Sequence, residues 1–194
     1  QATANRGQSM KVGLDHIPLL GHFKWDLVEF MGHAADYGYE GVQIPSGPLV
    51  EDGELRRRVA DTARDRDLYV EIGGAGIDAA RAGKTPAELA AGWPPLFEVA
   101  REVGARVLIT GIGTWPWVGR TSDEPGKSAA DQIAGGAATL REVGAMAGDN
   151  DLLVSVHTAF FTAAEHVRLM EEADSPHVGL CLDTANAYLV LEDP

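Results

Sequence analysis

Short apolar runs alternate with longer amphipathic segments along most of the chain, and this alternation limits the possible folds more than any other feature. Six runs have the length and character of buried strands, at residues 11–14, 41–44, 68–72, 106–110, 152–156 and 178–182. Five segments between them carry apolar residues three and four positions apart, at 25–37, 54–67, 86–103, 129–147 and 162–173. Strands and helices that alternate in this way predict an α/β fold with a parallel sheet.

Local signals support several of these helix boundaries. Thr85 and Thr162 are each followed by Glu three residues later, which predicts a capping box at the start of two helices. Gly38, Gly104 and Gly148 stand where helix C-caps are expected. The sequence therefore predicts helices that begin and end close to the proposed ranges.

Two architectures fit this order, an open doubly wound sheet and a TIM barrel. An open Rossmann sheet would carry a glycine fingerprint after its first strand, but residues 14–19 read LDHIPL. The glycine groups at 73–76 and 111–113 match neither GxGxxG nor a P-loop, and we interpret them as ordinary tight turns. We therefore expect the TIM barrel.

The length of the chain predicts an incomplete barrel. A complete (β/α)8 barrel takes about 250 residues and rarely fewer than about 200, whereas this chain has 194. We expect a single domain over residues 10–194 with only the first six βα units, preceded by a leader or expression remnant at 1–9. Such a fragment leaves sheet edges exposed, so we also expect a homo-oligomer or a completing chain.

Composition narrows the function classes. The 16 basic and 29 acidic residues give a net charge of −13, which argues against binding to nucleic acid or to anionic membrane surfaces. No apolar stretch approaches the roughly 20 residues of a membrane span. The only cysteine, Cys181, excludes an intrachain disulfide and is expected to be a small buried core residue. These features favour a cytoplasmic protein.

Polar residues gather at the predicted carboxyl ends of the strands, where TIM barrels carry their active sites. Asp183 directly follows an apolar strand, and burying a carboxylate is costly unless a metal, a cation or hydrogen bonds compensate it. The alternative is that Asp183 caps a local turn with Thr184 and Asn186. The other polar candidates at these ends are Asp15, His16, Gln43, Glu71, Ser155 and His157.

His157 and Glu71 are the candidate proton-transfer groups. The imidazole of His157 titrates near neutral pH, although a structural or substrate-contacting histidine fits the pattern as well. Glu71 would gain a raised pKa if it pointed inward, but a solvated surface acid is the open alternative. Trp115 and Trp117 flank a proline in a loop and could stack on sugar rings or serve in packing. The other histidines, at 22, 33, 166 and 177, are expected on the surface.

The segment DSPHVGLCLDTANAYLVLEDP, residues 174–194, resembles the sugar phosphate isomerase/epimerase family, the xylose isomerase-like TIM barrels. In that family the Asp of a DTxN or DTxH element binds a divalent metal. The resemblance implies that Asp183 binds Mn²⁺, Mg²⁺ or Co²⁺, and that His157, Asn186, His16, Trp115 and Trp117 surround a small carbohydrate. The implied reaction is isomerisation or epimerisation of a keto-sugar by metal-assisted proton transfer.

The chain departs from the family pattern at one position of this site. Ser155 stands where the family has a metal-binding Glu within an ENH-like triplet, and the family's remaining ligands, a His and a Glu, would lie beyond Pro194. The sequence therefore does not decide whether the chain binds the divalent metal. Two alternatives therefore stand: a noncatalytic or partner-dependent barrel with a degenerate metal site, and a lyase or deglycosidase-type enzyme that relies on His157. A family-related abasic-site endonuclease is disfavoured by the acidic surface and by Asn186.

Overall fold

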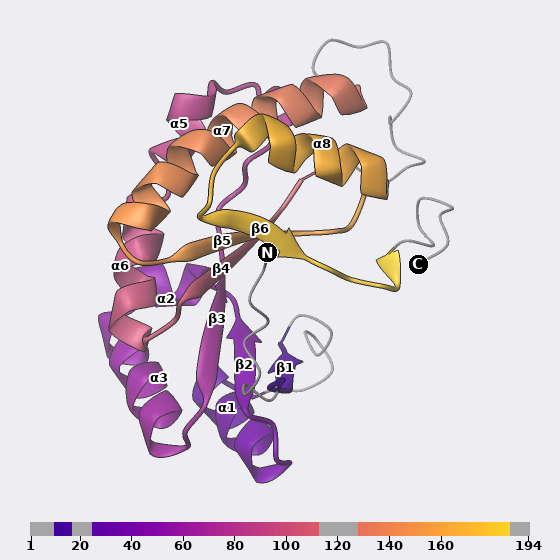
Figure 1. The fold of residues 1–194 in the computed structure, drawn as a ribbon. Helices are drawn as coiled ribbons and strands as arrows, with labels where there is room; N and C mark the ends of the chain where they lie inside the picture. The colour runs from indigo at the N-terminus through magenta and orange to yellow at the C-terminus, as the bar shows by residue number, and fades with distance from the viewer. Residues whose placement is uncertain (1–9, 17–24, 113–127, 187–194) are drawn as a thin grey trace.

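The strands of the protein form one parallel sheet in the order of the sequence (Figure 1). The computed structural model describes residues 10–16, 25–112 and 128–186. Within them the strands are β1 (Gly13–Asp15), β2 (Gly41–Ile44), β3 (Tyr69–Gly73), β4 (Val107–Gly111), β5 (Leu153–His157) and β6 (Val178–Cys181). All neighbouring pairs, from β1·β2 to β5·β6, are parallel.

The helices of the described residues lie between these strands along the chain. They are α1 (Leu27–Asp36), α2 (Gly47–Glu51), α3 (Gly53–Asp65), α4 (Ala79–Ala82), α5 (Pro86–Ala90), α6 (Pro94–Val103), α7 (Ala129–Asp149) and α8 (Ala163–Ala173). Figure 1 shows the longer helices following one side of the curved sheet as an arc. A doubly wound sheet would reverse its strand order and carry helices on both faces. The unreversed order therefore confirms the predicted partial TIM barrel.

Most of the predicted helix caps are present. Thr85 and Thr162 both form capping boxes, with Glu88 and Glu165 respectively. Gly38 and Gly104 have positive φ angles of 86° and 76°, which is the backbone conformation of a glycine C-cap. The prediction for Gly148 was wrong, because α7 continues to Asp149 and has Asn150 as its C-cap.

The helix predicted over 86–103 is interrupted. Proline lacks a backbone N–H, and Pro94 and Pro95 cannot continue the hydrogen-bond ladder of the preceding helix. The chain therefore ends α5 at Ala90, turns through Gly92, and starts α6 at Pro94. The turn buries Trp93 completely, with its ring centroid 5.9 Å from that of Phe97. The short helices α2 and α4 were not predicted.

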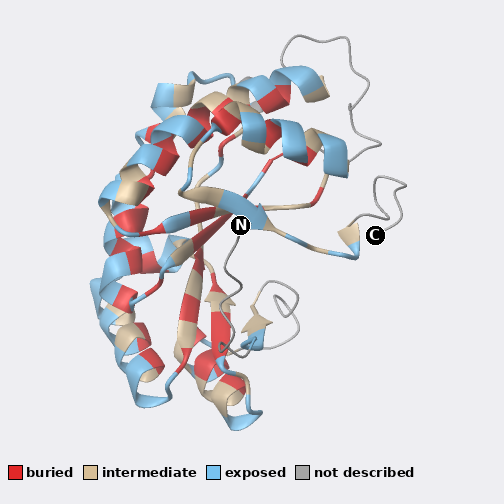
Figure 2. Ribbon diagram, in the orientation of Figure 1, coloured by how far each residue is buried: buried red, intermediate tan, exposed pale blue. Residues whose placement is uncertain are grey.

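The hydrophobic core lies between the sheet and the helices, and Figure 2 shows the buried segments on the strands and on the helix sides that face them. Alternate residues of each strand point into this core, among them Val42, Ile44, Val70, Ile72, Leu108, Val154 and Val156. The residues between them line the opposite, inner face. The register pairs Gln43 with Glu71, and Ile109 with Ser155, so each pair shares this inner face.

Two predictions about burial were wrong. His166, expected on the surface, is only 3% exposed and packs with its ring centroid 5.6 Å from that of Phe161. Cys181, expected in the core, is half-buried because it points to the inner face of the outermost described strand, β6. His33 and His177 are half-buried, and His22 lies outside the described residues. None of the helices in the described part of the chain has the length and apolar character that a membrane crossing needs.

Candidate functional site

A pocket of about 680 Å³ opens at the carboxyl ends of the strands. One part of its lining is polar and comes from β1, β2, β5 and the segment after β6: Asp15, Gln43, His157, Asp183 and Asn186. The other part is small or apolar and comes from the ends of β3, β4 and β5: Gly73, Gly74, Ala75, Gly76, Ile109, Thr110, Gly111, Ala159 and Phe160. A concave pocket with a few convergent polar groups is the usual form of a small-molecule site.

His157 and Asp183 meet in this pocket. His157 is the last residue of β5, and Asp183 follows β6 by two positions. The register places His157 opposite Cys181, which brings the two side chains to the same edge of the sheet. The Nε2 atom of His157 lies 3.3 Å from Oδ2 of Asp183, and both side chains are about one-third exposed, at 37% and 35%. The pair is therefore reachable from the pocket and is an ion pair whenever the imidazole is protonated.

Hydrogen bonds with Thr158, the residue after β5, and within the turn after β6 hold Asp183 in place. Its N–H donates to Oγ1 of Thr158 at 2.8 Å. Its Oδ1 atom accepts from the backbone N–H groups of Ala185, at 2.9 Å, and Asn186, at 3.3 Å. The turn-capping role and the pocket role, which the sequence left as alternatives, thus coexist: Oδ1 caps the turn while Oδ2 faces His157.

Glu71 lies on the inner face of β3, which resolves the question of its orientation. Burial raises the pKa of the Glu71 carboxyl, and the negative charge of Asp15 raises it further. Glu71 is not among the residues that line the pocket, although its register neighbour Gln43 is. It therefore shares the inner face with the pocket, level with Gln43 and two residues before the lining residue Gly73.

The remaining predicted site residues differ in their position relative to the pocket. The His16 ring lies edge-on to Phe30 of α1, with centroids 5.1 Å apart, and does not belong to the pocket lining. Asn186 lines the pocket. Ser155 is half-buried on the inner face, between Ile109 and Gly179 in the register. Trp115 and Trp117 lie outside the described residues.

A glycine-rich wall is the part of the pocket that the sequence analysis missed. The N–H of Gly74 donates to the carbonyl oxygen of Ile109 at 2.7 Å, and the Thr110 hydroxyl donates to that of Ala75 at 2.6 Å. A Cβ on Gly74 would lie only 2.7 Å from Cη2 of the buried Trp93. The segment 73–76 was interpreted as an ordinary turn, although its position after the third strand was a signal that it could line the site.

The described residues do not complete a metal site. Asp183 and His157 are adjacent, but within residues 10–16, 25–112 and 128–186 no group of three or more His, Cys, Asp or Glu side chains is placed to hold an ion. Divalent metal sites in proteins use more ligands than two side chains, or fill the remainder with water. The Ser155 hydroxyl adds no charge to this set. The described residues therefore do not by themselves fit the metal that the family resemblance implies, because they supply only Asp183 and His157.

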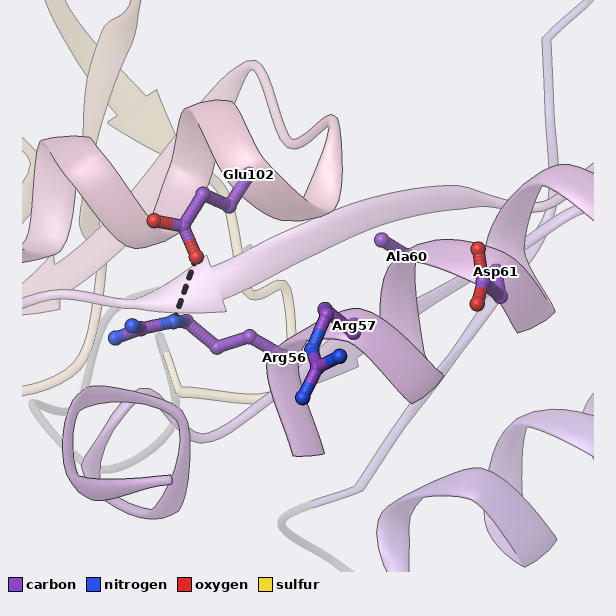
Figure 3. A pocket seen from close by; sticks show the side chains of 5 residues that line it. All are labelled: Arg56, Arg57, Ala60, Asp61 and Glu102. Carbon is purple, nitrogen blue, oxygen red and sulfur yellow. Dashed lines mark ion pairs between the residues drawn. The ribbon is translucent and has the colours of Figure 1, made fainter. Parts of the chain in front are cut away.

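A second hollow, of about 410 Å³, lies on the helix side of the sheet between α3 and α6 (Figure 3). Arg56 reaches across it, and its Nε atom lies 2.7 Å from Oε2 of Glu102. Arg57 pairs with Glu54 on the same helix. Asp61 pairs with Arg64, so each charged group that lines the hollow is already paired. Exposed ion pairs contribute little to stability. The strand-end pocket is therefore the better candidate site.

The sequential sheet, the helices on one side and the polar pocket at the strand ends define the class of partial TIM barrels. The family model described as "Xylose isomerase-like TIM barrel" matches residues 31–194. The chain therefore belongs to the xylose isomerase-like TIM barrel family. No curated protein matches its sequence.

Several solved structures share the fold. The probable 3-DHS dehydratase AsbF from Bacillus anthracis superposes with a TM-score of 0.69 at 18% identity, over 95% of this chain and 67% of its own. D-psicose 3-epimerase, solved in the presence of D-fructose, gives 0.71 at 15% identity over the same shares. The IOLI protein with a binding zinc atom gives 0.72 at 12% identity, over 95% and 66%. The chain thus spans about two thirds of the length of these proteins.

Proposed function

We propose that this protein acts on a small carbohydrate and moves a proton next to a carbonyl group, as a sugar isomerase or epimerase. The contact between His157 and Asp183 in a pocket at the strand ends is the observation that carries the proposal. Membership of the xylose isomerase-like family supports it, as does the likeness of the fold to a D-psicose 3-epimerase.

His157 is the proposed proton carrier. Its Nε2 atom faces Asp183, so Nδ1 is the nitrogen that remains to accept or return the substrate proton. The carboxylate of Asp183 orients the ring and stabilises the imidazolium that forms during transfer. The amide of Asn186, which lines the same pocket, would bind a substrate oxygen.

Glu71 is the second candidate acid. The raised pKa of its carboxyl brings its proton closer to the range that suits general acid catalysis. Because Glu71 is not part of the pocket lining, its proton would reach the substrate through one water molecule. The substrate contacts predicted for Trp115 and Trp117 remain predictions.

A divalent metal at Asp183, whether Mn²⁺, Mg²⁺ or Co²⁺, also remains a prediction. The IOLI protein was solved with a bound zinc atom. The described residues of this chain provide only Asp183 and His157 as ligands at the site. We therefore assign no step to a metal. A calorimetric titration of the metal-stripped full chain with Mn²⁺ measures whether the protein binds one ion.

A second candidate reaction is the elimination of water from the same kind of substrate. It begins with the same proton transfer, and it is favoured by Ser155 in place of a carboxylate and by the likeness of the fold to a probable dehydratase. The noncatalytic alternative predicts neither product. Within the described part of the chain β1 pairs only with β2 and β6 only with β5, so a homo-oligomer or a completing chain remains part of the proposal.

Product analysis tests the proposed function. The protein is incubated with free ketohexoses and their phosphates, and the products are separated by chromatography. A new isomer of the same mass supports an isomerase or epimerase, a product lighter by one water supports the elimination, and unchanged sugars throughout contradict both.

A further inference from the structure

We infer that Gly111 sets the length of sugar that the pocket accepts. Because Gly111 carries no side chain beside His157, the carbon chain of a ketohexose can pass over β4 at this point. The inference rests on the proposed function and deepens it, since it names a residue that determines which ketoses reach the candidate proton carrier.

Gly111 is the last residue of β4 and the neighbour of His157 across the sheet. Residues paired in this way share one face of a sheet, and neighbouring strands lie about 4.8 Å apart. Both residues line the strand-end pocket. The Nε2 atom of His157 faces Asp183, which follows β6 on the other side of β5. Position 111 therefore flanks the imidazole on the side away from Asp183.

The packing of the described residues gives no reason for a glycine at position 111. A Cβ there would meet none of their heavy atoms within 4 Å. Its φ angle lies outside the left-handed region that favours glycine, and the register with β5 continues to Gly111 without a bulge. Gly74 differs, because a Cβ there would lie 2.7 Å from Cη2 of Trp93. A strand glycine without a need of this kind often marks a place where a ligand approaches the backbone.

Polar groups of the pocket stand on both sides of Gly111. His157 and Asn186 belong to β5 and to the segment after β6, whereas Gln43 belongs to β2. The strands between them, β3 and β4, contribute Gly73 and Gly111 to the lining. Imidazole and amide groups hydrogen-bond with the hydroxyls that a sugar carries along its chain. A ketohexose with its carbonyl end at His157 thus reaches toward Gln43 by passing over Gly111.

A side chain at position 111 would occupy the path of the sugar. Gly111→Ala adds a methyl group and Gly111→Val adds a larger, branched group, both in space that the described residues leave open. A single extra carbon in a fitted pocket changes rates by roughly 10–200-fold. A short ketose such as dihydroxyacetone can stay on the His157 side of position 111. The substitutions should therefore act on long ketoses more than on short ones.

Proton exchange on ketoses of different length tests the inference. Wild type and variants are incubated in D₂O with ketohexoses (D-fructose, D-psicose, D-tagatose and D-sorbose), D-erythrulose or dihydroxyacetone, and NMR follows the entry of deuterium next to the carbonyl. With the best ketohexose, the rate should fall about tenfold in Gly111→Ala and about 100-fold in Gly111→Val. With the shortest ketose that the wild type accepts, the loss in Gly111→Val should be at least about tenfold smaller.

Gly179 supplies the matched control. It lies on the inner face of β6, opposite Ser155 in the register, and a Cβ there also meets nothing within 4 Å among the described residues. It does not belong to the pocket lining. Gly179→Ala and Gly179→Val should therefore exchange ketohexoses like the wild type. Thermal unfolding of each variant checks its fold, and Gly111→Ala keeps the test valid if the valine variant unfolds.

The outcomes separate the inference from the proposed function. Unchanged ketohexose exchange in the folded Gly111 variants overturns the inference and leaves the proposed function in place. Equal losses with long and short ketoses, or equal losses in the Gly179 variants, also overturn it, because the substitutions would then disturb the sheet rather than the path of the sugar. A wild type that accepts ketohexoses alone supports the inference when the Gly111 variants lose this exchange and the Gly179 variants keep it. Absence of exchange with every ketose contradicts the proposed function, and the inference with it.

Discussion

The backbone N–H of Asp183 donates to Oγ1 of Thr158, and this 2.8 Å hydrogen bond ties the candidate carboxylate to the strand that carries its partner. Thr158 directly follows His157 at the end of β5, and its own N–H donates to the carbonyl oxygen of Cys181. Two hydrogen bonds of Thr158 thus join the two strand ends next to the 3.3 Å contact between His157 and Asp183. This geometry makes Thr158 a positioning residue.

Thr158→Val should lower kcat by roughly tenfold or more, because a small displacement of a catalytic group is costly. Valine matches threonine in shape but leaves the Asp183 N–H without its acceptor. Steady-state kinetics on the sugar identified by product analysis measure kcat and KM separately. Thr158→Ser keeps the hydroxyl and should restore kcat, so equal losses in both variants would contradict the positioning role.

Glu71 predicts a pH-dependent stability. Burial and Asp15 raise the folded-state pKa of Glu71 above its ordinary value of 4.5, so the folded protein holds this proton more tightly than the unfolded chain. The resulting stabilisation is fully present below that value and is lost as the pH rises through the folded-state pKa. Glu71→Gln, which mimics the protonated form, should therefore gain stability relative to the wild type as the pH rises above 4.5 and through the folded-state pKa.

Urea denaturation at several pH values measures this difference in the free energy of unfolding. Glu98→Gln, at an exposed position on α6, is the matched control and should track the wild type. A Glu71→Gln variant that loses stability relative to the wild type as the pH rises would show that the ionised carboxylate is favoured by the fold.

Gly74→Ala should destabilise the protein by about 1–3 kcal/mol, as overpacking of a tight site does. Its Cβ would lie 2.7 Å from Cη2 and 3.1 Å from Cζ3 of Trp93, which is fully buried and cannot move aside. Gly76→Ala is the matched control, since a Cβ there meets nothing within 4 Å. Denaturant unfolding compares the two, and equal costs would show that the contact with Trp93 is not the cause.

Much of the fold could be predicted because its signals are local. The alternation of apolar runs and amphipathic segments located each strand of the described residues. The pairs Thr85 with Glu88 and Thr162 with Glu165 marked helix starts, because a capping box involves neighbouring residues only. The interruption at Pro94 was also signalled by its residue type, but the apolar spacing through Trp93 concealed it.

The rest depends on contacts between distant residues, which no local pattern contains. His166, on α8, packs against Phe161, and α8 itself packs on α7, whereas the place of His166 away from the strand ends had suggested a surface position. The position of His157 and Asp183 at strand ends was predictable, but their 3.3 Å contact depends on the register of β5 and β6. The wall at Gly73–Gly76 faces the pocket only because β3 and β4 are neighbours.

Hydrogen exchange at the substrate tests the central claim most directly. The protein is incubated with a free ketose in D₂O, and NMR follows the entry of deuterium at the carbon next to the carbonyl. We predict exchange by the wild type and a loss of roughly 10²–10⁴-fold in His157→Gln. His177→Gln, which changes the histidine before β6 rather than the one at the end of β5, should exchange like the wild type. Unaltered exchange in His157→Gln, or no exchange by the wild type, would contradict the account.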